Sequence, residues 1–143
     1  MNKNIIKTIC KCSDMAFFST GDLLDKMNEK NFKIKPLILD INKEYFKYYE
    51  ISKDILNKNN LEISNSNIFV KLMSSFAVYK KSLFDFDDSK IAKIMIDGIL
   101  IGVNDIEKAL DIDDYNEYKK LVISFQNFQN NTINELEKYL WFL

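Results

Sequence analysis

The sequence contains no histidine and no arginine, so its 20 basic residues are all lysine. Without an imidazole, the chain has no side chain that ordinarily titrates near neutral pH and no histidine ligand for a metal. Without a guanidinium, it has no bidentate clamp for phosphate or carboxylate groups. These absences exclude Ser-His-Asp and Cys-His catalysis, Cys2His2 zinc sites and di-iron sites built on Glu-x-x-His.

Residues that form turns are also scarce, with three glycines and one proline in 143 residues. A β-sandwich or β-barrel needs many more turn residues, and the apolar residues recur at the spacing of helices almost throughout. We therefore expect an all-α fold. The length is typical of one domain and 47% of the residues are hydrophobic, so residues 1–143 should form a single helical bundle domain.

The charges nearly cancel, at 21 acidic and 20 basic residues, which leaves no basic field for nucleic acid. The longest apolar stretch, residues 91–103, is interrupted by Lys93 and Asp97 and is too short to span a bilayer. The N-terminal residues show no small-residue cleavage site of a secretory signal. Two cysteines fit a reducing compartment better than a disulfide framework, so we expect a cytoplasmic location.

Apolar periodicity predicts four long helices, at residues 5–27, 34–58, 89–110 and 114–139, with a shorter helix at residues 67–84. Pro36 suits the first turn of the second helix, where its missing N–H costs no hydrogen bond. Asp87 or Asp88 can cap the helix that begins at Ser89. That helix is apolar on more than one face, so it should lie centrally or in an oligomer interface.

The connections between these helices indicate how they are arranged. Short loops join the first long helix to the second and the last two to each other, whereas residues 59–87 are long enough to cross a bundle. Two hairpins joined by one crossover is the ferritin-like arrangement. A faint internal echo agrees with it, because Asp14 and Asp22, like Asp97 and Asp105, are eight residues apart and share a helix face.

Three segments carry a resemblance to known proteins: SDMAFFSTGDLLDKM, SKIAKIMIDGILIGVNDIEKAL and FQNFQNNTINELEKYL. With them, the chain resembles ferritin-like proteins of unknown function from low-GC bacteria. The resemblance implies an antiparallel four-helix bundle with a short extra helix in the crossover connection. Di-iron members of the wider superfamily use carboxylates and Glu-x-x-His. This chain departs from that pattern, because Glu44 and Glu50 precede no histidine and the last helix carries Gln126, Gln129 and Asn130.

Four carboxylates remain as candidate metal ligands: Asp14, Glu44, Asp97 and Glu135. If they converged, with Gln129 as an alternative to Glu135, they would form an oxygen site for manganese or magnesium. Asp97 stands out because it lies within the apolar segment IMIDGILIG, where an ionised carboxylate needs partners. The simpler interpretation leaves it solvated or paired with Lys93. The sequence predicts no catalytic and no cofactor-binding residue.

Two short motifs have structural interpretations. Cys10 and Cys12 lie two residues apart and point about 200° apart on a helix, so they cannot bind one metal together. We expect one of these thiols to be buried and the other to be incidental. Gly98 and Gly102 allow close helix packing. We expect them to pack against a large neighbour such as Phe17, Tyr45 or Phe125.

The preferred hypothesis is a non-catalytic bundle that acts through its surface as a homodimer or as a partner-binding protein. Aromatic rings surround the helix at residues 45–49, and residues 141–143 (WFL) should dock on the bundle or on a second subunit. One alternative is a metal-binding protein or oxidoreductase that uses the four carboxylates without histidine ligands. Another is a small immunity or inhibitor-type protein whose acidic stretches, residues 85–89 and 111–117, engage a basic target.

Overall fold

The computed structural model describes residues 4–27, 31–62, 86–112 and 116–140. These residues form four long helices and no strand, which confirms the all-α class. The helices are α1 (Asn4–Lys26), α2 (Lys35–Lys58), α4 (Asp88–Ile112) and α5 (Lys119–Glu137), and a 3-10 turn, η2 (Asn116–Tyr118), precedes α5. The helix predicted at residues 67–84 lies outside the described residues.

Local sequence signals explain where two of the helices begin. Pro36 occupies the first turn of α2, as predicted. Asp87 caps α4, because its Oδ1 accepts a hydrogen bond of 2.8 Å from the backbone N–H of Lys90. The predicted start of the last helix at residue 114 was wrong, since α5 begins at Lys119 after the 3-10 turn. A pattern of apolar residues cannot separate a 3-10 turn from the first turn of an α-helix.

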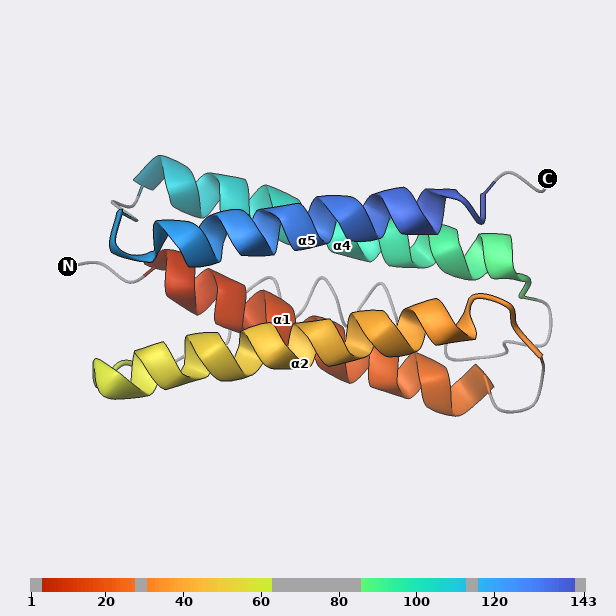
Figure 1. The fold of residues 1–143 in the computed structure, drawn as a ribbon, viewed down its shortest axis with the longest axis horizontal. Coiled ribbons are helices and arrows are strands. Elements are labelled where there is room, and N and C mark those ends of the chain that lie inside the picture. The colour runs from red at the N-terminus through yellow and green to blue at the C-terminus, as the bar shows by residue number, and fades with distance from the viewer. Residues whose placement is uncertain (1–3, 28–30, 63–85, 113–115, 141–143) are drawn as a thin grey trace.

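Figure 1 shows α1 beside α2 and α5 beside α4. The contact between α1 and α2 is the most extensive, and α4 contacts both α1 and α5. Asn42 of α2 secures the first pair, because its Nδ2 donates to the carbonyl of Phe17 and to Thr20 Oγ1, each at 2.9 Å. Aromatic rings bridge α2 and α5, with 4.8 Å between the ring centroids of Tyr45 and Phe128.

The core consists largely of isoleucine, with aromatic rings near its centre. All four helices contribute to it, and Ile9, Ile38, Ile91 and Phe125 are fully buried. Burying a side chain of this size stabilises a fold by roughly 1.5–3 kcal/mol relative to leaving it in water. The apolar rows that predicted the helices therefore also hold them together.

Both cysteines are buried, so the prediction of one buried thiol and one incidental thiol was wrong. Cys10 lies next to Ser52 of α2, whereas Cys12 lies next to Gln129 of α5. The two side chains do point in different directions. Both directions lead into the interior, because α1 has neighbours on more than one side.

Gly102 differs from its prediction as well. A Cβ atom at this position would lie 2.5 Å from Cys12 Sγ and 3.1 Å from Gln129 Nε2. The close neighbours of Gly102 are thus the thiol of Cys12 and the amide of Gln129. The prediction that Gly102 packs against a large aromatic ring was wrong. Gly98 lies beside a small internal cavity that Tyr45 also lines.

The aromatic residues of α2 fall on opposite sides of the helix. Tyr45 and Tyr48 are buried, whereas Phe46 is 39% exposed, so the rings that surround this helix divide between the core and the surface. Residues 141–143, whose docking was predicted, lie outside the described residues. Among the helices that the structure describes, none is both long and apolar enough to cross a membrane.

Candidate functional site

A polar layer lies in the interior of the bundle, and each of the four long helices supplies one residue to it. Gln129 of α5 is only 1% exposed, and its Nε2 lies 3.5 Å from Cys12 Sγ and 3.4 Å from Tyr45 Oη. Gly102 of α4 leaves the space in which Cys12 and Gln129 meet. The layer therefore depends on one small residue and three polar ones.

Burial keeps the acidic groups of this layer in their neutral forms. It raises the pKa of the Cys12 thiol to about 12 and raises the pKa of Tyr45 above its ordinary value. Both groups therefore carry a proton at neutral pH and can donate it in a hydrogen bond. A protonated, enclosed thiol is a poor nucleophile, so Cys12 is suited to a structural role.

The described residues do not satisfy all the hydrogen-bonding groups of Gln129. Its Oε1 is buried and has no hydrogen-bond partner among the described residues. Because Cys12 and Tyr45 are both donors, an amide turned to present Oε1 to them would accept from each. In either orientation one end of the amide lacks a partner in the described part of the chain, and such a group costs about 1–3 kcal/mol when left unpaired.

The four candidate metal ligands occupy different places. Glu44 and Glu135 both line a groove between α2 and α5, whereas Asp14 and Asp97 do not line it. Asp97 is exposed on α4, in agreement with its simpler interpretation. Asp14 is exposed on α1, and partial desolvation raises its pKa while the charge of Lys53 opposes that shift.

Two of the four carboxylates thus line the same groove. Within the described ranges, no three Cys, Asp or Glu side chains lie close enough to hold a metal ion. Gln129, the alternative ligand from the last helix, faces Cys12 and Tyr45. The pair in the groove supplies only carboxylate oxygen, and the Glu135 Oε1 atom already accepts a bond of 2.9 Å from Lys138 Nζ.

The groove is a broad hollow on the described surface, with a volume of about 690 Å³. Its walls are α2 and α5, and polar and apolar side chains alternate along them. The lining residues are Leu37, Asp40, Ile41, Glu44, Lys120, Ile123, Ser124, Asn127, Phe128, Asn131, Thr132 and Glu135.

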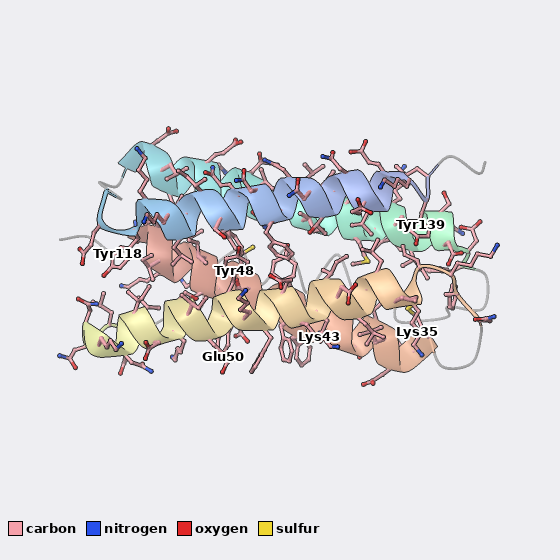
Figure 2. The ribbon with its side chains drawn as sticks, in the orientation of Figure 1. Lys35, Lys43, Tyr48, Glu50, Tyr118 and Tyr139 are labelled. Carbon is pink, nitrogen blue, oxygen red and sulfur yellow. The ribbon has the colours of Figure 1, made fainter. Side chains whose placement is uncertain are left out.

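Contacts between rings and hydroxyl groups connect α2 and α5 beside the groove. Tyr48 Oη and Ser124 Oγ lie 2.5 Å apart and join the two walls by a hydrogen bond. The rings of Tyr48 and Phe128 stack with centroids 5.3 Å apart. Figure 2 shows Tyr48 on the side of α2 that faces α5 and Glu50 on the opposite side. Large rings therefore hold α2 and α5 apart while still connecting them.

One apolar side chain in the groove remains open to solvent: Ile123 is 44% exposed. In the sequence, this side of the last helix is mostly polar, with Lys120, Asn127 and Asn131 around Ile123. An exposed isoleucine between Lys120 and Asn127 was the available signal, but a single exposed apolar residue is common on protein surfaces. Only the packing of α5 against α2 shows that Ile123 belongs to a groove.

Comparisons with known proteins give no further guidance. No protein-family model matches the chain, and no match was found among curated proteins or among solved structures. The candidate site therefore rests on the geometry of the groove and of the polar layer.

Proposed function

We propose that this protein is a non-catalytic, ferritin-like bundle of antiparallel helices that binds another protein through the groove between α2 and α5. The observation that carries the proposal is the groove itself, which leaves Ile123 exposed beside partly buried apolar side chains. An antiparallel course of α2 and α5 is supported by their contacts, because Tyr45 meets Phe128 while the later Tyr48 meets the earlier Ser124.

Physical chemistry favours an occupant for this groove. Leu37, Ile123 and Phe128 present apolar surface to it, and removal of apolar surface from water favours association. A groove between two helices is a common receptor for a helix of a partner. The interior layer competes poorly as a site, since its thiol is protonated and enclosed.

The immunity or inhibitor-type hypothesis is a special case of this proposal. Asp40, Glu44 and Glu135 lie around the groove, so a basic surface on a target would be attracted to it. The metal-binding hypothesis has less support, because only Glu44 and Glu135 of the four candidate ligands line the same groove.

Photo-crosslinking in native cells tests the proposal. A photoreactive residue is placed at Ile123 in one variant and at Leu100 in another, since these side chains have the same composition and are 44% and 43% exposed. Leu100 lies on α4, outside the groove lining. We expect one discrete crosslinked partner from position 123 and none from position 100.

The other outcomes of this experiment are equally decisive. A crosslink between two copies of the chain at position 123 would identify the groove as a homodimer interface and contradict a separate partner. Identical crosslinked products from both positions, or no product from position 123, would contradict binding through the groove.

A further inference from the structure

The charged side chains around the groove are mostly acidic. Asp40 and Glu44 come from α2 and Glu135 comes from α5, whereas Lys120 is the one basic residue among the described residues of the lining. The acidic groups therefore stand on both walls. Neither Asp40 nor Glu44 forms an ion pair with another described residue.

The third acid can change its partner at little cost. Glu135 pairs with Lys138 at 2.9 Å, but both side chains are more than half exposed. Exposed pairs of this kind contribute about 0–1 kcal/mol. A cation brought by an occupant of the groove can therefore replace Lys138. The groove offers three carboxylates to such an occupant.

The walls also restrict the shape of what can bind. Both are α-helices, whose backbone N–H and C=O groups are already hydrogen-bonded within each helix, so neither wall can accept an added β-strand. Recognition must then occur through side chains. Leu37 on α2, together with Ile123 and Phe128 on α5, presents apolar side chains that match the apolar stripe of an amphipathic helix.

We propose that the occupant is an amphipathic helix of another protein, with an apolar stripe that packs on Leu37, Ile123 and Phe128 and with lysine or arginine residues that pair with Asp40, Glu44 and Glu135. This inference rests on the proposed function and adds the chemistry of the partner. The acidic walls select for positive charge at the edges of the helix, and the apolar side chains select for its stripe.

Two synthetic helical peptides test the inference on the full chain. Both carry the same leucine stripe, and one has lysine where the other has glutamate along the edges of the stripe. Dissociation constants are measured by fluorescence anisotropy at low and high salt. We expect the lysine peptide to bind at least about tenfold more tightly at low salt, and we expect this difference to shrink as salt screens the charges.

A matched pair of double variants separates the groove from general attraction. Asp40→Asn with Glu44→Gln removes two charges from the groove, whereas Asp54→Asn with Glu50→Gln removes two charges from α2 outside it. We expect the first pair to abolish most of the preference for the lysine peptide and the second pair to preserve it. An equal loss of the preference for the lysine peptide in both double variants would overturn the inference.

The remaining outcomes distinguish this inference from the proposed function. If both peptides bind equally and Ile123→Asp abolishes both, the groove is a receptor without the proposed charge selection. If neither peptide binds while position 123 still crosslinks to a partner, the proposed helix is wrong and the binding function stands. If neither peptide binds and position 123 yields no crosslink, both proposals fail.

Discussion

Tyr48 of α2 and Ser124 of α5 are joined by a hydrogen bond of 2.5 Å between their side-chain oxygen atoms, and Ser124 lines the groove between these helices. The bond links two elements that are otherwise bridged mainly by aromatic rings. It therefore helps to set the distance between the walls of the proposed binding site.

Removing this hydrogen bond should destabilise the bundle modestly. We expect Tyr48→Phe to lower the free energy of unfolding by about 0.5–1.5 kcal/mol in urea denaturation, the usual contribution of one such bond. Tyr49→Phe is the matched control, because no hydrogen bond joins the Tyr49 hydroxyl to another described residue. Equal stability of the two variants would show that the Tyr48 hydroxyl does not connect the walls.

Gly102 should not tolerate even a methyl group. A Cβ atom there would lie 2.5 Å from Cys12 Sγ, so we expect Gly102→Ala to destabilise the protein by about 1–3 kcal/mol through overpacking. At Gly21 the nearest atom, Asn42 Nδ2, would lie 3.7 Å away in ordinary contact. Gly21→Ala should therefore stabilise α1 by about 0.5–1 kcal/mol in helix propensity. If Gly102→Ala and Gly21→Ala shift the denaturant midpoint in the same direction, the close packing of the polar layer is refuted.

The three polar side chains of the layer should behave as a unit. Gln129→Leu removes the group that contacts the Tyr45 hydroxyl and leaves this buried hydroxyl unpaired, at a cost of about 1–3 kcal/mol. Adding Tyr45→Phe removes the unpaired hydroxyl, so we expect the double variant to be more stable than Gln129→Leu alone. A double-mutant cycle in urea measures the coupling. Strictly additive losses would mean that these side chains do not interact.

The Cys12 thiol should make stability depend on pH in alkaline solution. Its pKa is raised from 9.0 to about 12 in the folded state, so the folded chain holds this proton more tightly than the unfolded chain. The contribution is fully present below about pH 9 and is lost as pH rises toward about 12. Urea denaturation from about pH 8 to about pH 10.5 should thus show a steeper fall in stability for the native chain than for Cys12→Ala. Parallel curves for the two proteins would contradict a buried, protonated thiol.

Helices were predictable from the sequence because their positions depend on local spacing. The apolar rows predicted the bounds of α1 and α2 closely, and Asp87 indicated the start of α4. The burial of individual side chains was harder to predict. Cys10 and Cys12 point in different directions, as expected, but only the tertiary packing of α1 determines that both directions are buried.

The groove could not be predicted, because it depends on the separation of two helices that are far apart in the sequence. That separation is set by where the rings of Tyr48 and Phe128 meet. The candidate carboxylates illustrate the same limit. Glu44 and Glu135 line one groove, whereas Asp14 and Asp97 lie elsewhere. The sequence alone does not distinguish these two pairs of carboxylates.

The most direct test of the central claim is the affinity of the crosslinked partner, once purified, for two variants of this protein. Ile123→Asp places a charge in the groove, and Leu100→Asp places the same charge at a similarly exposed position outside it. We predict that the first variant weakens binding at least about tenfold in isothermal titration calorimetry and that the second leaves it unchanged. Equal affinities for the two variants, or a loss confined to Leu100→Asp, would contradict binding through the groove between α2 and α5.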